Sequence, residues 1–126
     1  MTDINELRQA EPIRLDQEKL YALYSELGQV NADDVVCRAV EELAVRMAHC
    51  LTYHEKQQWS DLRKTARSMV AIDDQLGMIA LARVAQNVTQ AVDSAQDPAI
   101  SATLARLGRV GERSLMAIWD VQDMSV

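Results

Sequence analysis

Residues 59–77, WSDLRKTARSMVAIDDQLG, contain no proline and no glycine before the final residue, so nothing within the segment interrupts a helix. Apolar side chains recur three or four positions apart along it, which places them on one stripe of an α-helix. We therefore expect a long amphipathic helix that turns this stripe towards a core. The stripe is expected to comprise Leu62, Ala66, Met69, either Ile72 or Asp73, and Leu76.

Capping signals place two more helices before this segment. Asp16 is the expected N-cap of a short first helix that runs to Leu27, and Gly28 is its expected C-terminal stop. Asn31 is the expected N-cap of a second, longer helix that continues to about Lys56. Both segments repeat apolar residues three or four positions apart, as the central segment does.

Similar signals define the second half of the chain. Ser60 is a candidate cap of the central helix, and Gly77 separates that helix from the next. Asp97 and Pro98 form the clearest boundary, an N-cap followed by proline at the first helical position, and the last helix is expected to end near Gln122. Four long amphipathic helices with short links predict an all-α fold, an antiparallel up-down four-helix bundle preceded by a short N-terminal helix.

Length and composition indicate one domain. The 126 residues, 48% of them hydrophobic, suit a single core. We expect residues 1–14 to be a flexible lead-in, because Pro12 prevents a long helix there, and residues 15–126 to form the domain. The net charge of −6 makes nucleic-acid binding unfavourable. No run approaches the roughly 20 apolar residues of a membrane span, so we expect no membrane association.

The N-terminal sequence and the two cysteines predict a cytoplasmic location. The polar, acidic start of the chain does not have the pattern of a secretory signal. Cys37 and Cys50 fall in one predicted helix, roughly 20 Å apart at about 1.5 Å per residue, so they cannot bridge each other. Free thiols without an export signal are typical of the cytoplasm.

The central segment resembles the core helix of histidine-containing phosphotransfer (HPt) domains. That family typically shows a Trp, a Leu three residues later, the motif H-x-x-K-G-S, and a Leu-Gly pair that opens the next helix. Trp59, Leu62 and the pair Leu76-Gly77 have the family's spacing in this chain. Counting back from Leu76, the position of the phospho-accepting histidine is occupied by Arg67.

This difference changes the chemistry that the resemblance implies. A guanidinium is permanently protonated and has no lone pair for phosphoryl transfer, so we expect no catalytic residue and no enzyme. The resemblance covers about residues 15–120 and implies an HPt-like signalling module of a two-component phosphorelay. Such a module would bind a response-regulator receiver domain or a histidine kinase without relaying phosphate. The implied partner-binding residues are Arg63, Lys64, Arg67, Val70, Ala71 and Asp74.

Other functions stay open. The charged residues also fit an ordinary solvated helix face, and the chain could form a homodimeric structural or regulatory bundle unrelated to phosphorelay. His54 is expected to pack or cap at the end of the second apolar stripe, with a displaced phospho-acceptor as the alternative, and His49 is expected to be a solvated flanking residue. Cys50 and His54 share a helix face but supply only two ligands, so we expect no metal and no cofactor.

Overall fold

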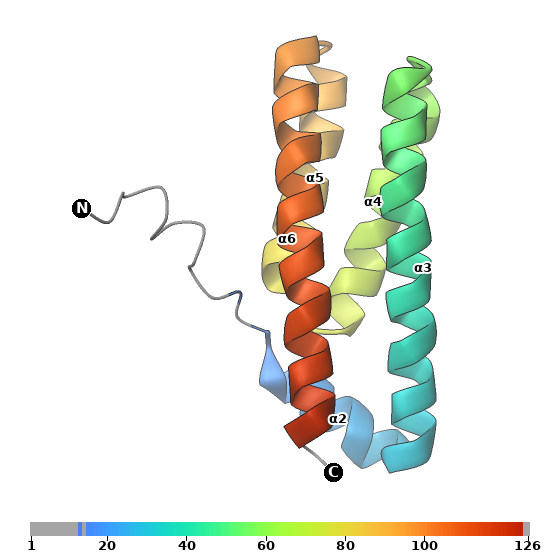
Figure 1. The fold of residues 1–126 in the computed structure, drawn as a ribbon, viewed down its shortest axis with the longest axis vertical. Coiled ribbons are helices and arrows are strands. Elements are labelled where there is room, and N and C mark those ends of the chain that lie inside the picture. Colours follow the sequence, from blue (N-terminus) through green and yellow to red (C-terminus); the bar gives the residue numbers. More distant parts are fainter. Residues whose placement is uncertain (1–12, 14, 125–126) are drawn as a thin grey trace, which may run out of the picture.

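A computed structural model describes residue 13 and residues 15–124 of the chain. Every regular element in these described residues is a helix, which confirms the all-α prediction (Figure 1). The expected flexible lead-in, residues 1–14, lies outside the described residues apart from residue 13. The helices are α2 (Gln17–Leu27), α3 (Gln29–Glu55), α4 (Trp59–Gln75), α5 (Ile79–Asp93) and α6 (Asp97–Met124).

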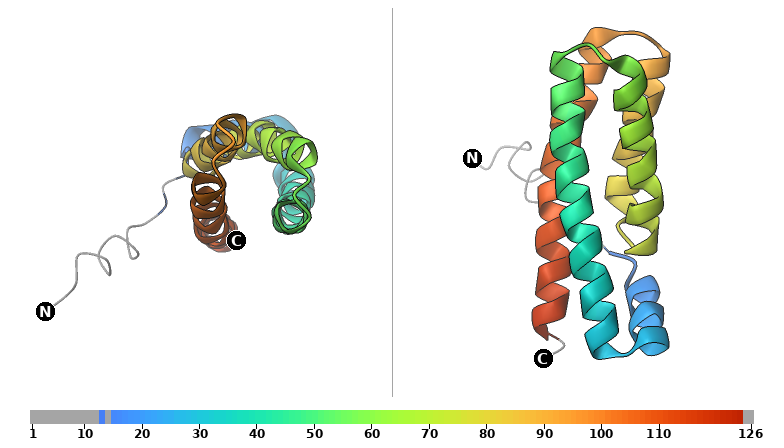
Figure 2. Two further views of the ribbon diagram at one scale, coloured as in Figure 1. Left: turned by 90° about the horizontal axis from the view of Figure 1, so that it is seen from above. Right: turned by 90° about the vertical axis from the view of Figure 1, so that its right-hand side faces the viewer.

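The helices form a bundle, and different helices make up its two halves. Helices α3 to α6 lie side by side, and each runs opposite to the helix before it (Figure 1). Helices α3 and α6 have 27 and 28 residues, whereas α4 and α5 have 17 and 15. The 11-residue helix α2 packs against the part of α3 that α4 and α5 do not reach (Figure 2). Helices α4 and α5 thus complete one half of the bundle, and α2 contributes to the other half.

The buried stripe of α4 follows the predicted spacing, and the structure shows which of two candidate residues completes it. Leu62, Ala66, Met69 and Leu76 are buried, as expected. At the position that the sequence left open, Asp73 is fully buried and Ile72 only partly. Asp73 lies seven residues after Ala66, about two helical turns, so its side chain points into the core. Apart from this carboxyl, the stripe is apolar and packs in one core cluster.

The ends of α2 and the start of α3 differ slightly from the prediction. The Asp16 carboxylate accepts hydrogen bonds from two first-turn amides, which confirms it as the N-cap of α2. Gly28 ends α2 with a φ of 81°, as expected, but α3 starts immediately afterwards at Gln29. The Asn31 side chain therefore lies inside α3 and donates to the Leu27 carbonyl oxygen, so its prediction as the N-cap was wrong.

Two more predicted caps lie within the first turn of their helices. Helix α4 starts at Trp59, because the Gln58 carbonyl already accepts from the Leu62 amide, so Ser60 is not its cap. Helix α6 starts at Asp97, one residue before the expected start at Pro98. These helices begin earlier because backbone carbonyls just upstream accept the first helical hydrogen bonds.

The turn between α4 and α5 is tied to the start of α2. The Asp16 amide donates to the Gly77 carbonyl oxygen at 2.7 Å. Gly77 has a φ of 73°, and a Cβ atom at this position would lie 2.5 Å from the Asp16 carbonyl oxygen. Only glycine combines this left-handed backbone with such a close approach. The turn therefore fixes where the first helix meets the rest of the bundle.

Side chains join α2, α3 and α6 at the other end of the molecule. The Tyr24 hydroxyl donates to Asp33 at 2.5 Å, and the Gln122 side chain donates to the same hydroxyl at 3.4 Å. Burial is the main reason that the pKa of Tyr24 is raised. In the middle of the bundle, the Met47 sulfur fills the space beside Gly111. Gly111 thus permits the close contact between α3 and α6 at this point.

Candidate functional site

The six predicted partner-binding residues lie on α4, but their surroundings differ. Arg67 is exposed to solvent, as are Lys64, Ala71 and Asp74. Val70 is partly buried and packs against the core, so it offers less apolar surface than expected. Because α4 turns by about 100° per residue, Arg63 and Val70 face α5, whereas Lys64 lies nearer α3. Arg67 therefore stands near the middle of the outward face.

Arg63 is held by an acidic side chain of the neighbouring helix. Its Nε donates to Asp93 Oδ1 on α5 at 2.7 Å, and its Nη2 donates to Oδ2 at 3.3 Å. This bidentate pair raises the pKa of Arg63 and lowers the pKa of Asp93. Arg63 thus connects α4 to α5 and already has a carboxylate partner. The sequence could not reveal this, because the two residues belong to different predicted helices.

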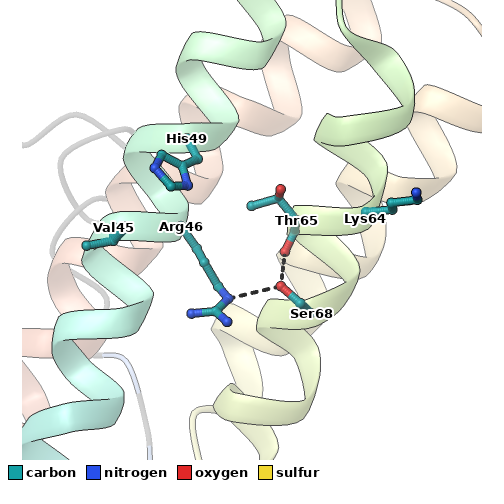
Figure 3. A pocket seen from close by; sticks show the side chains of 6 residues that line it. All are labelled: Val45, Arg46, His49, Lys64, Thr65 and Ser68. Atoms are coloured by element: carbon teal, nitrogen blue, oxygen red, sulfur yellow. Dashed lines mark hydrogen bonds between the residues drawn. The ribbon is translucent and has the colours of Figure 1, made fainter.

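Arg63 lies on the side of α4 that faces α5. On the opposite side, between α3 and α4, there is a groove of about 340 Å³. Figure 3 shows Arg46 reaching from α3 towards Ser68, while the Lys64 ammonium extends away from α3. Sequence reasoning singled out Lys64 and His49 but did not bring them together, since the groove is formed by two separate helices. Its lining residues are Val45, Arg46 and His49 of α3 and Lys64, Thr65 and Ser68 of α4.

His54, near the C-terminal end of α3, contacts side chains at the N-terminal end of α6. Its Nε2 lies 3.2 Å from Asp97 Oδ1 and 3.3 Å from the Ser101 hydroxyl, and its ring packs edge-on against Trp59. In a Ser-His-Asp catalytic triad the carboxylate and the hydroxyl contact opposite ring nitrogens. Here both contact one nitrogen, so the three side chains do not form a proton relay. The prediction that His54 packs at the end of the apolar stripe agrees with this position.

Two buried polar side chains have no hydrogen-bond partner among the described residues. They are Asp73 of α4, with both carboxyl oxygens unpaired, and Ser114 of α6. Burial, with a smaller contribution from the neighbouring Asp74 carboxylate, raises the pKa of Asp73 to about 8. Asp73 is therefore mostly protonated at neutral pH. The apolar spacing allowed Asp73 as an alternative to Ile72 in the buried stripe, but it did not reveal that the carboxyl would lack a hydrogen-bond partner and be protonated.

The two thiols have different environments on α3. Cys37 is exposed and Cys50 is buried, and both are free. Burial raises the pKa of Cys50 to about 11, which leaves it a poor metal ligand at neutral pH. The described part of the chain contains no group of three or more His, Cys, Asp or Glu residues that could hold a metal ion. Across the same residues, none of the helices has the length and apolarity needed to cross a membrane.

No family model, no curated protein and no solved structure matches this chain. Its function must therefore be inferred from its own residues and their arrangement.

Proposed function

We propose that this chain is an HPt-like signalling module that binds a response-regulator receiver domain or a histidine kinase and does not relay phosphate. The observation that carries the proposal is the exposure of Arg67 on the outer face of α4. The resemblance to HPt domains places the phospho-accepting histidine at this position. A guanidinium there suits an acidic pocket of a partner, but it cannot accept a phosphoryl group.

The surroundings of Arg67 support a docking role for this face. Lys64 and Ala71 are exposed beside it, so the face offers a second cation and a small apolar contact. Arg63 already pairs with Asp93 and contributes less. The contact would therefore centre on Arg67 and Lys64. This is a narrower surface than the six residues that the sequence suggested.

A binding study with purified receiver and kinase domains encoded beside the gene tests the proposal. The Arg67→Glu variant should weaken the complex by about 2 kcal/mol or more if the contact is desolvated. Arg83→Glu makes the same charge change at an exposed position of α5 and should leave binding nearly unchanged. If no receiver or kinase domain forms a complex, phosphorylated or not, the proposal fails.

A homodimeric bundle is the second candidate, and one surface favours it. Met116 and Trp119 of α6 are 57% and 54% exposed, and their three-residue spacing places them close together on the helix. Light scattering should show a dimer if this surface pairs with a second copy. A tight dimer that buries Met116 and Trp119 would support the homodimer, and one that buries the Arg67 face would favour the homodimer over partner docking.

Phosphorylation of a displaced histidine is the remaining alternative. His54 has one ring nitrogen in contact with Asp97 and Ser101, which limits its access to a phosphoryl donor. Incubation with a phosphorylated receiver, followed by a search for acid-labile phosphate, tests this directly. Label that persists in a His49→Gln variant and disappears in a His54→Gln variant would establish His54 as the acceptor and contradict the proposed loss of relay activity.

A further inference from the structure

The groove between α3 and α4 gathers basic and hydroxyl side chains on a protein whose net charge is −6. Arg46 and His49 line it from α3, and Lys64, Thr65 and Ser68 line it from α4 (Figure 3). The short side chains of Thr65 and Ser68 on α4 lie opposite α3, which leaves open space between the two helices. The local charge of the groove is therefore opposite to that of the chain as a whole.

The guanidinium of Arg46 is oriented by the groove itself. Its Nε donates to the Ser68 hydroxyl at 3.1 Å, and that hydroxyl donates to the Thr65 carbonyl oxygen at 2.7 Å. The Arg46 side chain is 31% exposed, so it is partly removed from water but remains open to the groove. A fixed and partly desolvated guanidinium makes stronger hydrogen bonds to anions than a freely moving one.

Binding capacity remains after these contacts. Nη1 of Arg46 donates to the Glu42 carbonyl oxygen at 3.4 Å and lies 3.6 Å from the Glu42 carboxylate, two long contacts that an anion in the groove could replace. Within the described residues, the Lys64 ammonium and the Thr65 hydroxyl have no partner. The Lys64 ammonium extends away from α3, and its flexible stem allows it to turn back over the groove. Val45, 52% exposed, adds an apolar surface at the outer edge of the groove, where its side chain points away from α4.

We propose that this groove binds a phosphate monoester. The phosphate oxygens would accept hydrogen bonds from Arg46, Thr65 and Lys64, and the organic substituent would extend past His49 towards Val45 at the outer edge of the groove. Several donors of different geometry suit a tetrahedral dianion better than a planar carboxylate. The volume is at the lower end of the range for small-molecule sites. The site goes beyond the proposed docking function and does not depend on it.

Nuclear magnetic resonance titration with phenyl phosphate tests the site at constant ionic strength. Saturable shifts should be confined to Val45, Arg46, His49 and Thr65, together with their immediate neighbours. Benzoate, which has the same ring but a carboxylate, should bind more weakly. Benzoate that binds as tightly as phenyl phosphate, or shifts spread over the whole surface, would overturn the proposal.

A phosphate monoester could come from a free organic phosphate or from a phosphorylated side chain of a protein. Comparing a phosphoserine peptide with phenyl phosphate distinguishes these two sources. Tighter binding of phenyl phosphate would identify a free organic phosphate as the ligand, and tighter binding of the peptide would identify a phosphorylated side chain. Either ordering supports recognition of a phosphate monoester. The proposal is wrong if neither ligand produces saturable shifts in the groove.

Charge variants of the groove should change the affinity for phenyl phosphate in both directions. Arg46→Gln should weaken phenyl phosphate binding at least about tenfold, because a charge-assisted hydrogen bond is lost. Lys64→Gln should weaken it about threefold, as expected for a more exposed charge. Glu42→Gln should tighten it about threefold, because the competing carboxylate is removed.

Arg106→Gln, at an exposed position of α6, makes the same change in net charge as Lys64→Gln and should have little effect. Equal effects of Arg106→Gln and Lys64→Gln would show a general charge effect and contradict a specific site. An unchanged affinity in Glu42→Gln would also count against it, since that variant leaves the core intact and does not depend on a loss of folding.

Discussion

Replacing Asp73 with Asn should stabilise the protein at neutral and alkaline pH. The Asp73 carboxyl is fully buried in the core, and neither of its oxygens has a hydrogen-bond partner among the described residues. Ionising such a group in the folded protein is costly because the charge has lost its hydration. Asn has nearly the same shape and cannot ionise, so the substitution removes the electrostatic cost while it keeps most of the packing.

The magnitude follows from the pKa. Asp73 titrates at about 8 in the folded protein, and an aspartate in an unfolded chain titrates near 3.9. Between these values the unfolded chain has released a proton that the folded protein retains, so the free energy of unfolding falls as pH rises. The slope approaches about 1.4 kcal/mol per pH unit, and the loss across the window is roughly 6 kcal/mol. Above about pH 8 both states are ionised and the dependence ends.

Urea unfolding, followed by circular dichroism at pH 5 and pH 8, measures this effect. The stability of Asp73→Asn relative to the wild type should increase by about 4 kcal/mol between the two pH values. Asp74→Asn is the matched control, because it removes the adjacent exposed carboxylate and leaves Asp73 in place. It should keep most of the decline seen in the wild type, because the Asp74 carboxylate makes the smaller contribution to the raised pKa of Asp73. If the unfolding free energies of the wild type and Asp73→Asn run parallel from pH 5 to pH 8, the buried, protonated state of Asp73 is refuted.

Three further predictions concern backbone freedom and thiol access. Gly77→Ala should lower the free energy of unfolding by about 2 kcal/mol or more in urea titrations, because its Cβ meets the Asp16 backbone and its φ is left-handed. Gly108→Ala should raise it by about 1 kcal/mol, since the position is helical and has open space; a loss would contradict that environment. A thiol reagent should modify Cys37 rapidly in the native protein and Cys50 only after unfolding, and equal rates would contradict the burial of Cys50.

Periodicity and capping residues were enough to predict the helices but not all of their boundaries. The sequence correctly placed Asp16 and Gly28 at the ends of the first helix, because their roles depend on local backbone geometry. It misplaced Asn31 and Ser60, since a capping residue in a sequence only permits a helix to start there. In both cases a backbone carbonyl upstream of the predicted cap, that of Gly28 or Gln58, accepts the first helical hydrogen bond, so the helix starts earlier.

The core and the candidate sites show where one-dimensional patterns are insufficient. Hydrophobicity favoured Ile72 for the buried stripe of α4, whereas the helical repeat from Ala66 favoured Asp73. In the structure, Asp73 is the residue that is fully buried. The α3–α4 groove and the Arg63–Asp93 pair each combine residues from two helices, so no single segment carried their signal. The exposure of Arg67 agrees with a partner-binding face, and its partner stays a prediction.

The hydrogen bond between the Asp16 amide and the Gly77 carbonyl has a practical consequence for attaching labels to this protein. It holds the start of α2 beside the α4–α5 turn, while α6 ends near the α2–α3 junction (Figure 1). A fluorophore attached at the start of α2 would therefore lie beside that turn, and one attached in the last turn of α6 would lie near the α2–α3 junction. The two labels would report on different parts of the molecule.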